Sequence, residues 1–278
     1  MPVFALNNPM ITTSIRLLKG YPWFKRLNAK ITYEILSRYI RSSEWHFMNY
    51  GYSPKSCELG CGISAATPQR FPMQMYHYLA TKVPIEGKVV LEVGSGRGGG
   101  ARYITQNLKP SSYTGMDIAK NAVKLANKNH VLPNLRFIQG SAESIPLADN
   151  SVDVVLNVES CHGYGCVPTF LSETRRVLAP GGHLLLVDFR NSAENMKIFK
   201  EQLKDSGLEC IEEENISENV VAAIEAEDQS KNEMIRKLVP GRWQKLFCQF
   251  AGTVGSPFHE TLRVGTRQYY RFVLRKAA

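Results

Sequence analysis

From residue 88 onward, short apolar runs alternate with segments whose apolar positions recur at helical spacing. The apolar runs predict strands over residues 88–93, 113–116, 135–139, 152–158, 183–187, 208–214 and 268–275. The intervening segments predict helices over residues 98–108, 119–129, 168–178 and 196–206. Because alternating strands and helices build a sheet covered on both faces, we expect an α/β fold with an open, mostly parallel sheet.

Two other zones flank this pattern. Residues 1–70 predict helical pieces and a stretch rich in Gly, Ser, Pro and Cys from Gly51 to Pro68, which we interpret as an ordered loop or lid. We therefore divide the chain into a helical N-terminal extension and lid, residues 1–70, and a main domain, residues 71–278. Residues 217–265 follow no clear period, and we expect them to include a helix that covers the mouth of a functional site.

The distribution of charge along the chain bears on which partners the protein binds. With 278 residues and 44% hydrophobic content, the chain can bury one sizeable core, and no apolar run reaches the roughly 18 to 20 residues that span a bilayer. The net charge of +9 is uneven: residues 1–70 carry 9 Lys/Arg against 3 acids, and residues 229–278 carry 10 against 2. Three interpretations stay open: a solvated surface, contact with nucleic acid, or peripheral membrane contact through basic N-terminal helices.

Cysteine usage bears on metals and on the cellular compartment. The six cysteines, at positions 57, 61, 161, 166, 210 and 248, lack the paired spacing of a structural zinc site or the density of a disulfide framework. We therefore predict reduced thiols, no metal, and a cytoplasmic protein that is at most peripheral to a membrane. An organelle transit peptide within residues 1–33, which carry basic residues and no acid, is the alternative.

A glycine-rich run supplies the first candidate chemistry. Leu91-Glu-Val-Gly-Ser-Gly-Arg-Gly-Gly99 follows an apolar strand and opens a helix, so its backbone N–H groups face a nucleotide-like cofactor. The run also matches GxGxxG, a weak signal for a dinucleotide. A dinucleotide strand is normally apolar up to its first glycine, whereas Glu92 stands two residues before Gly94, which favours a cofactor with an ammonium group. Asp117 ends the next strand, where it can hold ribose hydroxyls or cap the following helix.

Four segments in order resemble the motifs of the class I S-adenosylmethionine-dependent methyltransferases. VVLEVGSGRGGG is similar to the first motif of that family, YTGMDIA to its ribose-binding strand end, GSAESIP to its adenine loop and VLAPGGHLLLVD to its fifth-strand motif. The resemblance covers residues 88–188. It implies S-adenosyl-L-methionine as the cofactor and a Rossmann-like sheet of seven strands, of which residues 268–275 would supply the antiparallel one.

The same resemblance assigns residues to the cofactor. Gly94, Ser95 and Gly96 would line the methionine moiety, and Glu92 would support it. The remaining assignments are Asp117 to the ribose, Ile118, Ser141, Ala142 and Glu143 to the adenine, and the main-chain carbonyl of Asn157 to the ammonium. The family often has Asp where this chain has Ser141, so the contact to the adenine amino group is weaker here or moves to Glu143.

Methyl transfer to a hydroxyl requires a base near the ends of the fourth and fifth strands. Asn157-Val-Glu-Ser-Cys-His162 follows the fourth strand, and Asp188 closes the fifth. An imidazole can titrate near neutral pH, so His162 is the candidate general base, with Asp188 or Glu159 to orient it. A structural histidine that caps the loop is the alternative.

Segments outside this core resemble two lipid-directed subfamilies, the phthiotriol dimycocerosate O-methyltransferases and, less closely, the sterol C-methyltransferases. HFMNYGYS, MYHYLATKV and VLNVESCHGYG carry this resemblance. It implies a hydrophobic small-molecule or lipid acceptor that is methylated on a hydroxyl or, alternatively, on a carbon whose cation Glu159 and aromatics stabilise. Tyr52 would be a lid aromatic near the sulfonium, or else a core residue. The candidates for the acceptor pocket are Tyr50, Tyr76, His77 and Tyr164.

Two further classes can be weighed on sequence. A nucleic-acid methyltransferase is disfavoured, because the enzymes that methylate base amino groups have an Asn/Asp-Pro-Pro-aromatic motif where this chain has Asn157-Val-Glu-Ser. A protein that binds S-adenosylmethionine without turnover would keep the same glycine loop and Asp117, so it stays an alternative. The sequence does not specify the oligomeric state.

Overall fold

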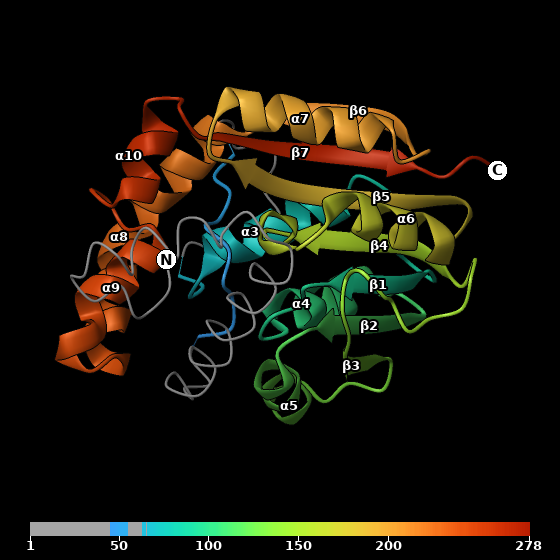
Figure 1. The fold of residues 1–278 in the computed structure, drawn as a ribbon. Helices are drawn as coiled ribbons and strands as arrows, with labels where there is room; N and C mark the ends of the chain where they lie inside the picture. Colours follow the sequence, from blue (N-terminus) through green and yellow to red (C-terminus); the bar gives the residue numbers. More distant parts are fainter. Residues whose placement is uncertain (1–44, 55–62, 65) are drawn as a thin grey trace, which may run out of the picture.

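A computed structural model describes residues 45–54, 63–64 and 66–278, and its strands form one sheet (Figure 1). The strands are β1 (Val89–Val93), β2 (Ser112–Asp117), β3 (Leu135–Gln139), β4 (Val152–Val158), β5 (Leu178–Arg190), β6 (Glu209–Asn215) and β7 (Gln268–Arg275). Their order is β3-β2-β1-β4-β5-β7-β6, and β7 alone runs antiparallel to its neighbours. This confirms the expected seven-stranded, mostly parallel sheet with its late antiparallel strand.

The strand order reverses between β1 and β4, which are paired at the centre of the sheet. In an open α/β sheet, ligands bind outside the carboxyl ends of the strands at such a reversal. The register places these ends level with one another. Val93 of β1 pairs with Met116 of β2, and Val158 of β4 pairs with Val187 of β5. The glycine loop, Asp117 and the segment after β4 therefore meet at one edge.

Helices cover both faces of the sheet. One layer contains α3 (Arg70–Ala80), α4 (Gly99–Leu108) and α5 (Lys120–Asn129), and the other contains α6 (Val167–Val177) and α7 (Ala193–Lys204). Side chains of a strand alternate between the two layers: Val90 belongs to the apolar cluster of the first layer, and Leu91 and Val93 to that of the second. By this alternation Glu92 faces the first layer, inside the protein.

Three helices stand beyond the carboxyl edge of the sheet (Figure 1). They are α8 (Ser217–Leu238), α9 (Gly241–Ala251) and α10 (Pro257–Arg263), in the segment 217–265 that was expected to include a helix over the mouth of the site. The chain marks the breaks between them. Pro240 precedes α9, Gly252 ends it in the left-handed region at φ 66°, and Ser256 caps α10 by accepting the His259 amide.

The N-terminal prediction is tested only in part. Residues 1–44, with the basic stretch considered for membrane contact, lie outside the described residues, as does most of the predicted loop. Residues 45–54 contain neither helix nor strand. They cross the carboxyl edge of the sheet beside the N-terminal end of α4, where the His46 carbonyl closely approaches Gly99.

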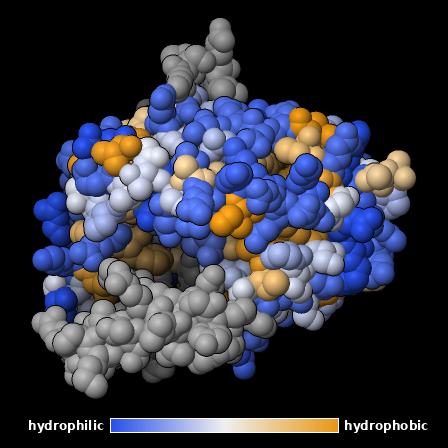
Figure 2. All heavy atoms as spheres, turned by 45° about the horizontal axis from the view of Figure 1, so that its top comes forward, coloured by the Kyte–Doolittle hydropathy of each residue, from blue (hydrophilic) through white to orange (hydrophobic). Residues whose placement is uncertain are grey.

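The surface seen in Figure 2 is largely hydrophilic, and hydrophobic residues form only small patches among polar ones. This distribution is expected when most apolar side chains are buried between the sheet and the helices on its two faces. Within the described ranges, no helix combines the length and apolar character needed to cross a bilayer.

Close packing between α3 and α4 depends on a glycine. A Cβ added to Gly100 would lie 2.0 Å from the ring of Tyr76, and that ring is buried with its hydroxyl hydrogen-bonded. We predict that Gly100→Ala lowers the free energy of unfolding by about 1–3 kcal/mol through overpacking. Thermal and urea denaturation measure it. Gly241→Ala, at a helical glycine with open space around it, should leave stability unchanged or slightly raised, and equal effects of the two variants would contradict this explanation.

Candidate active site

The glycine loop between β1 and α4 has one glycine without space for a side chain and one with open space around it. A Cβ at Gly94 would lie 2.4 Å from the Ser160 hydroxyl, whereas at Gly96 the nearest atom would be the Met48 sulfur, 3.8 Å away. Both glycines have positive φ, 82° and 52°. Between them, the Ser95 hydroxyl is buried without a hydrogen-bond partner in the described structure. An unpaired buried hydroxyl beside an open glycine suits a polar cofactor, so the loop fits the role expected of it.

Asp117 closes this loop from the end of β2. One carboxylate oxygen accepts the Gly96 amide and the other accepts the Ala119 amide, each at 2.8 Å. The side chain thus orders both the loop and the start of α5, as the capping alternative required. A carboxylate has about four acceptor positions, so Asp117 keeps the capacity to hold ribose hydroxyls as well.

The segment expected at the adenine lies beside Asp117, after β3. Ser141 accepts the Glu143 amide at 3.3 Å, and the Glu143 carboxylate accepts the Cys166 amide at 2.9 Å. Ile118 and Ala142 are half-buried at the same edge. Glu143 therefore joins the predicted adenine loop to the loop after β4. Its contact with adenine stays a prediction.

Glu92 points away from the loop, into the α3–α4 layer. It is fully buried, and its two oxygens accept the hydroxyls of Tyr76 at 2.7 Å and Tyr113 at 2.9 Å. Burial raises the pKa of Glu92 to about 7, against the two hydrogen bonds. Glu92 can support the cofactor only indirectly, by holding β1 in place. Tyr76, expected in the acceptor pocket, is instead the partner of this buried acid.

A second buried network joins the ends of β1 and β4 below Gly94. The Asn157 side-chain nitrogen lies 2.9 Å from each of three acceptors, the Val93 carbonyl, Ser160 Oγ and the Tyr164 hydroxyl, which share its two N–H donors. Tyr164 was expected to line the acceptor pocket, but its hydroxyl is turned into this network. Sequence reasoning missed Ser160, although its place directly after Glu159 and below a glycine could have indicated a close approach.

His162 and Asp188 form a hydrogen-bonded pair where β4 and β5 end. The ring Nδ1 lies 2.8 Å from one Asp188 oxygen, and the His162 amide donates to the other at 2.8 Å. The His162 side chain is 31% exposed, and Nε2 contacts no partner in the described part of the chain, whereas Asp188 is fully buried. An ionised carboxylate accepts, so Nδ1 is the nitrogen that donates to Asp188, and in the neutral ring Nε2 then presents a lone pair outward.

Asp188 is held as a carboxylate by an unusual number of donors. Besides His162, it receives the Cys161 thiol and the Phe189 amide, each at 2.8 Å, and Arg190 lies 3.4 Å away. Burial alone would raise the pKa of Asp188, but His162, Arg190 and these hydrogen bonds bring it well below its usual range. Of the two groups expected to orient the base, the structure selects Asp188.

Glu159 occupies a different position. It has φ 48°, a left-handed conformation that is uncommon for a residue with a side chain, and it is 8% exposed. Its carboxyl accepts the Tyr50 amide at 2.8 Å, and the Tyr269 hydroxyl lies beside it without the geometry of a regular hydrogen bond. Burial raises the pKa of Glu159 to about 8, although Lys231 opposes the shift.

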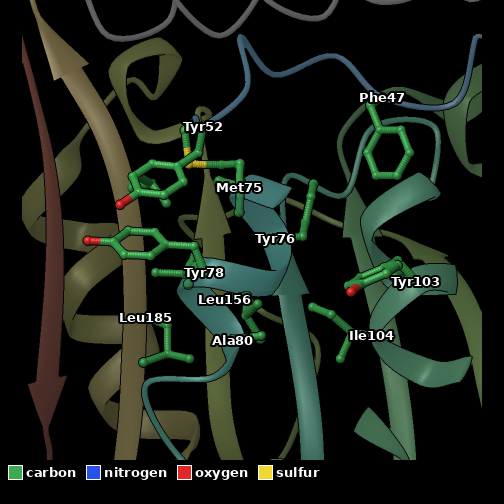
Figure 3. Close-up of a cluster of buried hydrophobic side chains, with 14 of the residues drawn as sticks. Phe47, Tyr52, Met75, Tyr76, Tyr78, Ala80, Tyr103, Ile104, Leu156 and Leu185 are labelled. Atoms are coloured by element: carbon green, nitrogen blue, oxygen red, sulfur yellow. The ribbon is translucent and has the colours of Figure 1, made fainter. Parts of the chain in front are cut away.

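The predicted lid aromatic is a core residue. Tyr52 is 4% exposed, and its ring stacks on Tyr78 with centroids 4.0 Å apart, as Figure 3 shows. His77 likewise has a local partner, because its Nδ1 lies 2.9 Å from the Tyr103 hydroxyl. Neither residue lies in contact with His162, so the sulfonium and acceptor roles expected of them are not supported.

Aromatic rings do gather next to His162, but from other segments. The Phe189 ring is 4.3 Å from the His162 ring, and Phe258 of α10 packs edge-on against Phe189 at 5.0 Å. Tyr50, one of the expected pocket residues, stacks on Phe258 at 3.7 Å. An apolar wall therefore borders the candidate base. Phe258 could not be found from the sequence, since it lies nearly a hundred residues away in a segment without a clear period.

Comparison with known proteins agrees with this geometry. The family model described as "Methyltransferase domain" matches residues 91–186, the segment that holds the glycine loop, Asp117 and His162 and that ends two residues before Asp188. A phthiotriol/phenolphthiotriol dimycocerosates methyltransferase of Mycobacterium leprae is 33% identical over 245 residues, which cover 88% of this chain and 90% of the relative. A fatty-acid O-methyltransferase of Mycolicibacterium smegmatis is 31% identical over 282 residues and 99% of both chains.

The fold is also similar to solved structures. The [4+2]-cyclase SpnF superimposes with a TM-score of 0.74 over 91% of this chain and 97% of its own, at 18% sequence identity. At that identity the likeness concerns the fold alone, and a cyclase on this fold shows that the sheet does not by itself decide the chemistry. The residues at the carboxyl edge have to decide it.

The environment of Glu92 generates a prediction about pH. Its folded-state pKa of about 7 lies above the ordinary 4.5, so Glu92 contributes most stability below pH 4.5 and loses that contribution as pH rises through 7. Relative to Glu92→Gln, the free energy of unfolding of the wild type should fall by up to about 3 kcal/mol between pH 4.5 and 7.5. Urea denaturation across this range measures it. The exposed Glu201→Gln should retain the wild-type profile, and parallel curves for Glu92→Gln would refute the explanation.

Proposed function

The chain belongs to the class I S-adenosylmethionine-dependent methyltransferases, and we propose that it transfers a methyl group to a hydroxyl of a hydrophobic small molecule or lipid, with His162 as general base. One observation carries the proposal: the buried, ionised Asp188 lies 2.8 Å from Nδ1 of a half-exposed His162 at the carboxyl edge of the sheet. This arrangement is suited to removing a proton from an acceptor hydroxyl.

The bound cofactor supplies an electrophilic methyl group on a sulfonium. The residues that would hold it are those of the glycine loop and of the neighbouring end of β2. Ser95 offers its unpaired hydroxyl, Gly96 offers open space, and Asp117 offers the acceptor capacity that the ribose hydroxyls need. These three features come from one loop and one strand end, so cofactor binding requires no rearrangement of the sheet.

His162 acts through the position of its proton. Because Nδ1 donates to Asp188, the lone pair of the neutral ring at Nε2 is the one available to an acceptor hydroxyl, whose proton it would take during methyl transfer. The imidazolium that forms is stabilised by the same carboxylate. Phe189 packs on the ring and limits its rotation. The chain thereby supplies orientation and proton transfer, which this displacement chiefly requires of a protein.

An apolar acceptor accords with the wall of Tyr50, Phe189 and Phe258 next to the base. The relatives from Mycobacterium leprae and Mycolicibacterium smegmatis bear names of lipid methyltransferases. We extend this acceptor class, but none of the individual acceptors, to the present chain.

Carbon methylation is the alternative, and Glu159 bears on it. A carbocation intermediate would call for a negative charge nearby, but burial raises the pKa of Glu159 to about 8, which leaves this carboxyl mostly protonated at neutral pH. Oxygen methylation with His162 needs no such charge. A protein that binds the cofactor without turnover is the second alternative, and only an assay of transfer separates it from an enzyme.

For the cellular setting, we propose a cytoplasmic enzyme in peripheral contact with the membrane that holds its acceptor. The excess of ten basic over two acidic residues in positions 229–278 supports attraction to anionic lipid. The basic N-terminal stretch, which lies outside the described residues, would add to it. Nucleic acid is not proposed as a partner.

The cofactor site can be tested on Asp117. We predict that Asp117→Ala weakens binding of S-adenosylhomocysteine by on the order of 1.5–3 kcal/mol, because charge-assisted hydrogen bonds are lost and the loop amide of Gly96 loses its acceptor. Isothermal titration calorimetry measures the change. Asp205→Ala, an exposed aspartate at the end of α7, serves as the matched control. An unaltered affinity in Asp117→Ala would remove this residue from the site.

The base can be tested by transfer of a labelled methyl group from S-adenosylmethionine into a lipid extract. We predict that the wild type labels the solvent-extractable fraction and that His162→Ala lowers the rate about 100-fold or more, since general-base catalysis contributes roughly 10² to 10⁴. Affinity for S-adenosylhomocysteine should not change. His183→Ala, five residues before Asp188 on β5, is the control. Turnover equal to wild type in His162→Ala would show that another group removes the proton.

A further inference from the structure

A large cavity adjoins the candidate active site on the side of α8 and α9. Its volume is about 1180 Å³, above the roughly 300–1,000 Å³ of pockets for drug-sized ligands. Tyr50 is among its lining residues, and the Tyr50 amide donates to Glu159. Arg97 and Gly99 of the glycine-rich run also line the cavity. The cavity therefore borders the candidate site through Tyr50 and the end of the glycine-rich run, and its volume is sufficient for a long molecule.

The cavity lining has an apolar part and a charged part. Much of the lining is apolar and comes from the segment crossing the sheet edge, from α3 and from α9: Phe47, Met48, Phe71, Met73, Phe247 and Phe250. The rest is charged, with five cations against two carboxylates: Arg70, Arg97, Arg102, Lys231 and Lys237 against Glu227 and Glu233. Burial lowers the pKa of His46 and brings that of His130 to about 4, so neither lining histidine adds charge at neutral pH.

Two of the charged residues are buried in α8. Glu227 and Lys231 are each 7% exposed, one helical turn apart, and their nearest charged atoms are 3.4 Å from each other. The Glu227 oxygen in this contact has no hydrogen bond, and among the described residues Glu227 is the one ion-pair partner of Lys231. An ammonium has three donors, and burying one with so few contacts is costly. A buried cation with spare donors on a cavity wall indicates a ligand oxygen.

We propose that this cavity binds an acceptor with a long apolar chain and an anionic head, and that Lys231 binds an anionic oxygen of that head. The excess of cations over carboxylates gives the lining a positive potential that favours such a group. Glu227 lies 3.4 Å from the ammonium, but two carboxylates in the lining do not cancel the charge of five cations. Met73 and Phe247 belong to the apolar walls along which the chain of the ligand would lie.

Tyr50 connects the cavity to the catalytic end of the sheet. It lines the cavity together with Lys231, and its amide donates to the carboxyl of Glu159, the residue two positions after Asn157. An oxygen held by Lys231 thus lies in a cavity that borders the loop carrying His162. Lys231 would be a residue that determines specificity, because it selects the head of the acceptor without taking part in proton transfer. This inference rests on the proposed lipid acceptor and narrows it to an anionic amphiphile.

The test measures binding without turnover. Laurate and 1-dodecanol share one chain length and differ in head charge, and each is titrated by calorimetry into protein saturated with S-adenosylhomocysteine. We expect wild type to bind laurate at least about tenfold more tightly than dodecanol. The double variant Lys231→Met/Glu227→Gln removes the charge pair without leaving one buried ion alone, and it should abolish this preference. Lys245→Met, an exposed lysine of α9 outside the cavity lining, should keep it.

Two results would overturn the inference: equal binding of both ligands by wild type, or a laurate preference that survives in the double variant. The affinity for S-adenosylhomocysteine and the circular dichroism spectrum verify that each variant is folded. Failure here is distinguishable from failure of the proposed function. A wild type that shows no laurate preference but methylates a lipid extract would refute only the anionic head, whereas Lys231-dependent laurate binding without any transfer would refute only the enzymatic role.

Discussion

The geometry of the candidate active site depends on one buried carboxylate, Asp188 at the end of β5. It receives the Cys161 thiol, the His162 amide, the His162 ring and the Phe189 amide, with Arg190 close by. These contacts fix the turn that follows β4 against the neighbouring strand, and the same contacts decide which ring nitrogen of His162 faces the acceptor. Charge-assisted hydrogen bonds of this kind are among the stronger polar interactions in proteins, so a single side chain sets both the path of the loop and the tautomer of the base.

Three buried acids near the carboxyl edge of the sheet show how the number of hydrogen-bond donors around a carboxyl group affects its ionisation. Asp188 has several donors and an arginine, and it is ionised. Burial raises the pKa of Glu92 to about 7 despite two tyrosine hydroxyls, and that of Glu159 to about 8 with one backbone amide as its regular hydrogen bond. Desolvation acts on all of them, and the donors decide how much of it is offset. The site therefore presents one fixed negative charge, behind the base, and two acids that are largely neutral or close to it. That division favours proton removal over stabilisation of a cation.

Much of the fold was accessible from the sequence, because its strands are short runs rich in apolar residues. The predicted bounds of 135–139, 152–158 and 268–275 match the structure, and parallel strands bring Asp117, His162 and Asp188 to one edge, as expected. The cover of α8, α9 and α10 was not resolved from sequence, since α8 buries Glu227 and Lys231, which interrupt the apolar stripe that reveals a helix. Aromatic residues were also misjudged. Tyr52, Tyr76 and Tyr164 stand in motifs near the site, but which way a tyrosine points depends on partners distant in sequence, here Tyr78, Glu92 and Asn157.

In the proposed mechanism, Nε2 of the neutral His162 ring presents a lone pair to the acceptor because Asp188 holds the proton on Nδ1. Two-bond ¹H–¹⁵N correlation spectra of the histidine rings test this arrangement, at a pH where the ring is neutral and with His162→Ala to assign the signal. We expect a protonated Nδ1 and an unprotonated Nε2 in the wild type, and a shift of the tautomer distribution in Asp188→Asn. A proton on Nε2 in the wild type, or a tautomer that Asp188→Asn leaves unaltered, would contradict the role assigned to this pair.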